Sequence, residues 1–364
     1  MDSRNEMNNQ PGIIVKAKNE LVEIMKDKRV FTLIKLIADE TPLGKVTKPL
    51  RQGYRALIQI ENEQRRNRLK DFIVGIAQDN PEIPDIPPED FLAVVRKLLQ
   101  DDEDEKVYLY VHLCVTLARS HLDRDTRLYY LRMASELTFS QIKFARELYL
   151  RSNIPLKGYL SIEAAKEALI SAENGMTLRA LSTLSNWGLI KARNVVSDTT
   201  VYDLTEDMQQ LMNLLFSPPE LMPEAIGSEA KDSWDVIIVN HLRSANEQFP
   251  AFLHQLIEKK GFSVEVVERE SNFREMKLAR CYITTGLYTE RLSYGEKKYV
   301  AIHTLQHPDN PTDNLKLPDR RFKVPEDSFF SKGLGQNSDS NLLIKKLDEI
   351  ATYIVEHFLS KTPN

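Results

Sequence analysis

The chain has 364 residues, of which 42% are hydrophobic and 28% are charged, and its formal net charge is -4. This composition is that of an ordinary globular protein of two or three domains, and the slight acidity argues against a protein that coats nucleic acid nonspecifically. No apolar run in the sequence approaches the length that spans a bilayer, so we expect a cytoplasmic protein without a membrane partner. The two cysteines, Cys114 and Cys281, are far apart among apolar neighbours and are predicted to be buried thiols rather than a disulfide.

The first 137 residues are predicted to form a helical domain. Apolar residues recur at helical spacing in residues 13–38 and 50–77, and again in residues 91–99 after a proline-rich segment. An acidic run at residues 101–106 lacks the glycine and the carboxylate spacing of a calcium-binding loop. We therefore interpret this run as the start of a helix, and we predict no metal site.

Residues 138–216 are predicted to form a winged helix-turn-helix domain. The segment from Met176 to Trp187 has apolar side chains on one side of a short helix, and Gly188 ends that helix. Two alternating segments around a turn follow and predict a pair of strands, so the order is helix, strand, turn, strand. Helix starts are predicted at Thr138, Ser161 and Thr205 from their capping side chains.

A DNA-binding winged helix directs helix side chains to base edges and strand side chains to phosphates. The residues that would make these contacts here are Arg179, Ser182, Thr183, Asn186, Lys191 and Arg193. The stretch from Met176 to Leu204 nevertheless contains only three basic residues and two acidic ones. Because a fold alone does not fix function, packing of this domain against a protein is an equal alternative.

The first two-thirds of the chain has an acidic, aromatic and helical pattern in residues 66–78, 86–118 and 128–149, and a short segment with Gly188, Leu189 and Ile190 follows at residues 184–194. Together they resemble the bacterial abortive-infection alpha family over about residues 45 to 215. The resemblance rests on pattern and brings no catalytic residues. It implies a role in phage defence.

Residues 217–233 are rich in proline, serine and acidic residues and are predicted to be a linker. In residues 234–364 strand and helix patterns alternate, and the chain ends in a predicted helix. Such alternation predicts a three-layer α/β domain with a mainly parallel sheet, either TIR-like or flavodoxin-like. The whole chain is thus predicted to be multidomain, with a helical region, a winged helix and an α/β domain.

Ligands of such sheets bind beyond the carboxyl ends of the strands. These ends are predicted near Asn240, near residues 268–271 and near residues 284–288. The glycine-rich motifs for dinucleotides and triphosphates are missing from the sequence, as are the main motifs of hydrolases. The residues predicted to contact a nucleotide are Asn240, His241, Thr284, Thr285, Tyr288 and Ser293.

Residues 283–305 are predicted to run from a strand through a loop containing Glu296 to the next strand. This segment resembles the nucleotide-facing loop of TIR domains, although the tryptophan and cysteine that precede the glutamate there are missing. The resemblance implies that Glu296 is catalytic and orients the ribose of NAD while the glycosidic bond breaks, with NAD as the substrate and no cofactor required. Two alternatives stay open: Glu296 and Lys298 could belong to a nuclease strand, or Glu296 could be a surface charge.

These patterns together predict a bacterial antiphage protein in which a winged-helix sensor is joined to a nucleotide-binding, NAD-cleaving effector. Its expected partners are DNA or a phage protein, and it is expected to assemble as a homo-oligomer. The alternative is a non-enzymatic DNA-binding regulator whose α/β domain binds a ligand or mediates assembly.

Overall fold

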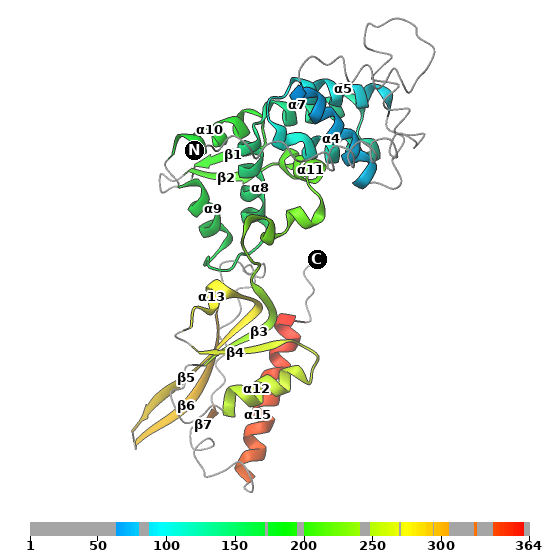
Figure 1. The fold of residues 1–364 in the computed structure, drawn as a ribbon. Coiled ribbons are helices and arrows are strands. Elements are labelled where there is room, and N and C mark those ends of the chain that lie inside the picture. The colour runs from blue at the N-terminus through cyan, green and yellow to red at the C-terminus, as the bar shows by residue number, and fades with distance from the viewer. Residues whose placement is uncertain are drawn as a thin grey trace, which may run out of the picture. The chain divides into compact units, whose positions relative to one another are not determined.

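The computed structural model describes residues 63–79, 87–171, 174–194, 200–240, 248–268, 271–293, 295–305, 324–325 and 338–359 (Figure 1). This part of the chain is mostly helical and includes a small group of three parallel strands. It divides into two compact units, the first of residues 1–149 with 173–222 and the second of residues 150–172 with 223–364.

The first unit is formed mainly by helices. They are α4 (Glu63–Asp79), α5 (Pro88–Gln100), η1 (Asp104–Lys106), α6 (Val107–Arg119), α7 (Arg124–Glu136), α8 (Phe139–Asn153), α10 (Gly175–Asn186), α11 (Glu206–Leu215) and η2 (Pro218–Leu221), and residues 150–153 at the end of α8 belong to the second unit. Helix α6 is apolar on most of its sides and packs against α4, α5 and α11. Its Cys114 is a free, fully buried thiol, as predicted, and burial raises the pKa of this thiol to about 12.

The helix starts predicted from capping residues are confirmed. Thr138 and Gln141 form reciprocal hydrogen bonds between side chain and backbone at the start of α8. The hydroxyl of Ser161 accepts from the Ala164 amide, and that of Thr205 accepts from the Met208 amide. Each cap satisfies an amide that the first turn of a helix cannot satisfy within itself.

Helix α10 is followed by two antiparallel strands, β1 (Ile190–Asn194) and β2 (Thr200–Leu204), and then by α11. Gly188 adopts φ +72°, a left-handed conformation that favours glycine, and it ends α10 where the sequence predicted an end. The order of helix, strand, strand and helix is the one predicted from the sequence.

The second unit contains a five-stranded sheet of order β4-β3-β5-β6-β7. Its strands are β3 (Asp232–Asn240), β4 (Val264–Glu268), β5 (Lys277–Leu292), β6 (Gly295–Leu305) and β7 (Val324–Pro325), and its helices are α9 (Ile162–Ile170), η3 (Pro223–Ile226), α12 (Gln248–Glu258), α13 (Phe273–Met276), α15 (Ser338–Ile354) and the π-helix η4 (Val355–Leu359). Strand β3 is parallel to β4 and β5, whereas β5, β6 and β7 are antiparallel.

The prediction of a mainly parallel, three-layer domain is therefore correct only in part. The three parallel strands are present, but β5 turns back directly into β6 and makes the sheet mixed. Both long helices, α12 and α15, pack with Val236 and Ile238 into the same core cluster. The opposite face, with Ile237 and Val239, packs against Phe273 of the single-turn helix α13. Because β5 turns back into β6 without a connecting helix, the described part of the chain brings no long helix to that face.

Residues 150–172 join the second unit through backbone contacts with its sheet region. The Lys157 amide donates to the Glu229 carbonyl oxygen over 2.9 Å, and the Gly158 amide donates to the Glu275 carbonyl oxygen over 3.0 Å. Leu156 is buried and forms an isolated antiparallel bridge with Ala230. The segment 217–233, predicted to be a linker, is thus occupied by two short helices and by these contacts.

Candidate functional site

The carboxyl edge of the parallel strands brings two polar side chains together. Asn240 ends β3 and Glu268 ends β4, and the strand register pairs them. Asn240 is 5% exposed, and its Nδ2 donates to Oε1 of Glu268 over 3.2 Å. Glu268 itself is exposed. The edge therefore presents a solvent-facing carboxylate that a buried amide orients. His241, also predicted to contact a nucleotide, lies outside the described residues.

The strand connections reverse direction at this edge. From β3 the chain passes through α12 to β4 on one side, and then through α13 to β5 on the other side of β3. The two helices belong to core clusters on opposite faces of the sheet. The register pairs Thr284 with Val239, so Thr284 and Thr285 lie on the strand that borders the reversal. Open α/β sheets bind ligands where the connections diverge in this way. We call this place, between β3 and β5 at the carboxyl end of β3, the reversal point.

The other predicted residues of this unit lie further along the β5–β6 hairpin. Tyr288 is within β5, Ser293 is exposed at the turn, and Glu296 is within β6. The prediction of a loop here is wrong, because strands occupy both sides of the turn. His303 pairs with Thr284, and Glu296 is seven positions from His303 (303 minus 296), which corresponds to roughly 23 Å along a strand. The structure does not bring Glu296 to the reversal point.

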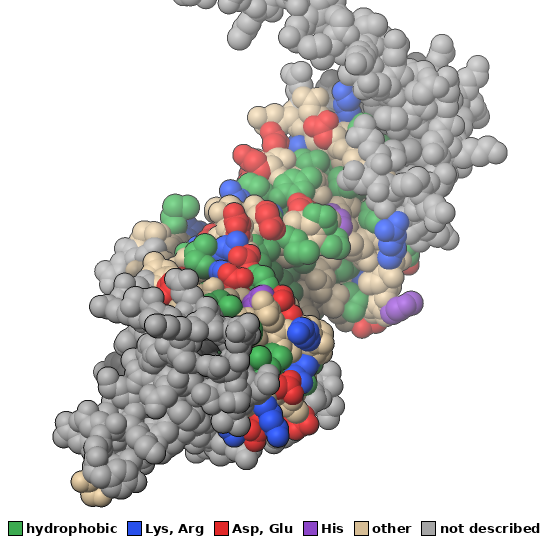
Figure 2. Space-filling view, turned by 90° about the horizontal axis from the view of Figure 1, so that it is seen from below, with side chains coloured by type: hydrophobic (Ala, Val, Ile, Leu, Met, Phe, Trp, Pro, Cys, Tyr) green, Lys and Arg blue, Asp and Glu red, His purple; other side chains and the backbone are tan. Residues whose placement is uncertain are grey.

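A second candidate surface is formed by α10 and β1. Arg179, Ser182 and Asn186 are exposed on α10, and Lys191 and Arg193 are exposed on β1. The opposite side of α10 is buried, as the predicted apolar spacing requires. Within the described part of the chain, neither Arg179 nor Lys191 forms an ion pair. In Figure 2, Lys and Arg side chains are interspersed with Asp and Glu. The described surface in that view therefore has no patch of a single charge.

Thr183 and Arg193 are engaged by neighbouring residues of the protein. The Thr183 hydroxyl donates to the Arg179 carbonyl oxygen over 2.9 Å and accepts from Nε2 of the buried Gln141 over 3.1 Å. It therefore anchors α10 to α8. Arg193 Nε lies 3.3 Å from Oδ2 of Asp203, and both side chains are exposed. Such an exposed pair contributes less than about 1 kcal/mol and can be exchanged for a phosphate contact.

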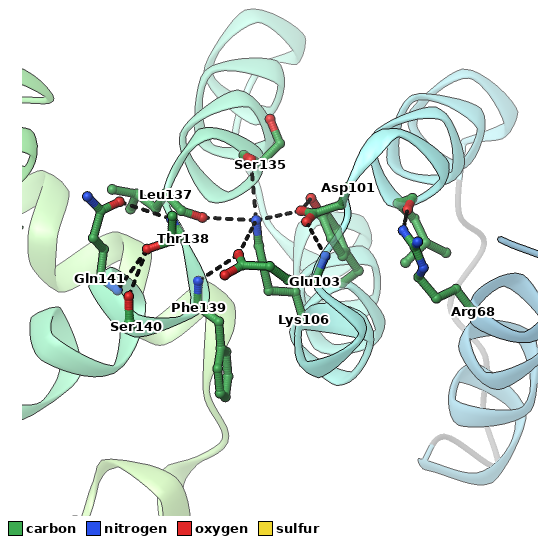
Figure 3. Close-up of polar contacts among 12 residues, drawn as sticks. Arg68, Asp101, Glu103, Lys106, Ser135, Leu137, Thr138, Phe139, Ser140 and Gln141 are labelled. Carbon is green, nitrogen blue, oxygen red and sulfur yellow. Dashed lines mark hydrogen bonds and ion pairs between the residues drawn. The ribbon is translucent and has the colours of Figure 1, made fainter. Parts of the chain in front are cut away.

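The acidic run at residues 101–106 ends in a buried lysine, Lys106 (Figure 3). Lys106 is 2% exposed, and its Nζ donates to the backbone oxygens of Ser135 and Leu137 over 3.2 and 2.9 Å. The same Nζ lies 2.5 Å from Oδ2 of Asp101 and 3.9 Å from Oε2 of Glu103. We call Lys106, Asp101 and Glu103 the lysine cluster.

The lysine cluster connects three helices. Lys106 binds the carbonyl oxygens at the end of α7, and Glu103 accepts from the Phe139 amide at the start of α8 over 2.8 Å. Burial by itself raises the pKa of Asp101, but hydrogen bonds from Lys106, the Tyr110 hydroxyl and the Glu103 amide outweigh it and hold this pKa below its ordinary value. The arrangement is that of a structural ion pair, because the lysine fills the position that a ligand would need.

Comparison with protein-family models, with curated proteins and with solved structures finds no match for this chain. Among the residues that the structure describes, no group of three or more His, Cys, Asp or Glu side chains could hold a metal ion. No helix in that same part is long and apolar enough to cross a membrane.

Sequence reasoning identified Asn240 but not its partnership with Glu268. The two residues are 28 positions apart, and only the parallel register of β3 and β4 brings them together. The end of each strand was visible in the sequence, but nothing local indicated which ends would be neighbours.

Proposed function

We propose that the second unit binds a nucleotide at the carboxyl edge of β3, β4 and β5, and that the chain acts in bacterial phage defence. The observation that supports the nucleotide site is the reversal of strand connections beside Asn240, whose buried amide holds Glu268 at the same edge. The defence role is supported by the resemblance to the abortive-infection alpha family. NAD cleavage is supported by the resemblance to TIR domains alone.

Isothermal titration of the purified full-length protein with ADP, ADP-ribose and NAD tests the nucleotide site. We expect saturable one-to-one binding of at least one of these compounds, with free adenine and inorganic pyrophosphate as controls that carry only part of each ligand. Absence of saturable binding by all three compounds at millimolar concentration would overturn the proposal. Nicotinamide release from NAD, followed with and without phage infection products, separates an enzyme from a ligand-binding regulator.

The second candidate function is nucleic-acid binding by a winged helix formed from α10, β1 and β2. It is supported by the exposure of Arg179, Lys191 and Arg193 on neighbouring elements. The first turn of α10 also exposes two apolar side chains, Met176 at 73% and Leu178 at 63%. Exposed apolar side chains favour a protein partner. We therefore propose that this surface is the sensor, with DNA or a phage protein as the partner.

A further inference from the structure

We propose that Glu268 recognises the ribose of the bound nucleotide by accepting hydrogen bonds from its 2′ and 3′ hydroxyl groups. This inference rests on the proposed nucleotide site and specifies the part of the ligand that lies over β4.

The ion pairs of the sheet set Glu268 apart from the other described carboxylates on β3 and β4. Asp232 lies 3.1 Å from Lys157, Asp235 lies 3.4 Å from Arg280, and Glu265 is paired with Lys277. These three carboxylates are each neutralised by a cation from the protein. The fourth, Glu268, has no such cation among the described residues. It is the one at the carboxyl edge of the sheet.

The hydrogen bond from Asn240 orients Glu268 without using its full capacity. Nδ2 of Asn240 donates to Oε1, and in the described part of the chain no hydrogen bond is made to Oε2. An ionised carboxylate only accepts hydrogen bonds and has about four lone-pair positions. A ribose diol offers two neighbouring hydroxyl donors, which match such an acceptor. A phosphate would be repelled by it.

The position of Glu268 also fits one end of a nucleotide. Strand β4 lies two strand spacings from β5, which is about 10 Å, and the reversal point lies between β3 and β5. A ligand with its phosphate at the reversal point and its ribose toward β4 would bring the ribose diol to Glu268. A single carboxylate with an amide donor beside it does not make a site for a metal ion, which needs several oxygen ligands.

Titration of the full-length protein with ADP and 2′-deoxy-ADP tests this assignment, in the wild type and in Glu268→Gln. Glutamine keeps an oxygen for the Asn240 amide, so thermal unfolding should be unchanged. In the wild type we expect the deoxy compound to bind about 10- to 100-fold more weakly than ADP. In Glu268→Gln, ADP should bind as weakly as the deoxy compound, and the preference for ribose should disappear. Glu258→Gln, an exposed change on α12, is the matched control and should retain the preference.

Two results would overturn the inference while leaving the nucleotide site in place. One is equal binding of ADP and 2′-deoxy-ADP to the wild type. The other is an equal loss of affinity for both compounds in Glu268→Gln, which would indicate an effect of charge rather than recognition of the diol. If neither compound, nor ADP-ribose, nor NAD binds the wild type, the proposed function fails and this inference fails with it.

Discussion

At the scale of single residues, Lys106 shows how an acidic run can serve stability instead of binding a ligand. Its ammonium group is surrounded by two carboxylates and two backbone oxygens, all supplied by the protein. Buried charges require such partners because the loss of hydration costs several kcal/mol for each ion. The cluster therefore depends on Lys106, because removal of this lysine leaves both carboxylates without a cation.

Lys106→Met is expected to lower the free energy of unfolding by about 3–5 kcal/mol, because Asp101 and Glu103 lose their buried cation. Urea unfolding followed by circular dichroism measures this change. Lys191→Met removes an exposed lysine and serves as the control, with an expected change within about 0.5 kcal/mol. A loss below about 1 kcal/mol for Lys106→Met would contradict the structural role of the cluster.

The lowered pKa of Asp101 predicts a dependence of stability on acid. Because the folded-state pKa lies below the ordinary value of 3.8, the stabilisation is present above that value and is lost as the pH falls through the folded-state pKa. Urea midpoints measured between pH 6 and pH 2 should therefore fall below about pH 4. In Asp101→Asn the fall in the urea midpoint below about pH 4 should be smaller than in the wild type. An identical pH profile in both proteins would argue against a stabilising role for the ionised Asp101.

Because Glu296 lies in β6, its substitution tests nucleotide binding and NAD cleavage separately. Glu296→Gln should leave the affinity for ADP unchanged within about twofold, because the residue lies roughly 23 Å along the strand from the reversal point. Titration with ADP and an assay of nicotinamide release should be made on the same preparation. Lost binding would place Glu296 in the site after all. Retained binding with unchanged NAD cleavage would rule out its TIR-like catalytic role.

At the scale of elements, features determined by neighbouring residues were predictable and features determined by distant partners were not. The capping box of Thr138 and Gln141 spans four residues, and Gly188 ends its helix through its own backbone conformation. By contrast, apolar and polar side chains alternate only weakly in residues 283–305, around Gly286 and Gly295. This segment forms strands because β5 and β6 pair with each other. The two carbonyl oxygens that accept from Lys106 likewise lie about thirty residues away.

The basic side chains on α10 and β1 predict how binding to DNA depends on salt concentration. Changing Arg179, Lys191 and Arg193 together to alanine should weaken binding to duplex DNA and reduce the slope of log K against log salt concentration by about 3, since each phosphate contact contributes about one unit. Fluorescence anisotropy at several salt concentrations measures this slope.

A control with the same change in charge replaces three exposed basic residues of the second unit, Lys259, Arg274 and Lys345, by alanine. This variant should keep the wild-type slope. If both triple variants bind DNA alike at every salt concentration, the surface is a protein contact, and the apolar Met176 and Leu178 become the residues to change.

At the scale of the whole molecule, the division into two units predicts that they unfold separately. Leu156 and Leu184 are both buried, at 1% and 0% exposure, but they belong to different units. Each change to alanine should cost about 2–5 kcal/mol. Hydrogen exchange should accelerate in β3 and β5 for Leu156→Ala, and in α10 and α11 for Leu184→Ala. The same exchange pattern in both variants would show that the two units unfold as one.

The assignment of residues 150–172 to the second unit has a consequence for synthesis on the ribosome. This segment emerges before residues 173–222, which belong to the other unit, and before its own partners at Ala230 and Glu275. Ala230 lies 74 residues after Leu156 (230 minus 156) and Glu275 lies 117 residues after Gly158 (275 minus 158), so these partners follow after about 4–23 s at typical rates of translation. During that interval the bridge between Leu156 and Ala230 cannot form, so we expect a nascent chain paused here to offer a binding site for a chaperone.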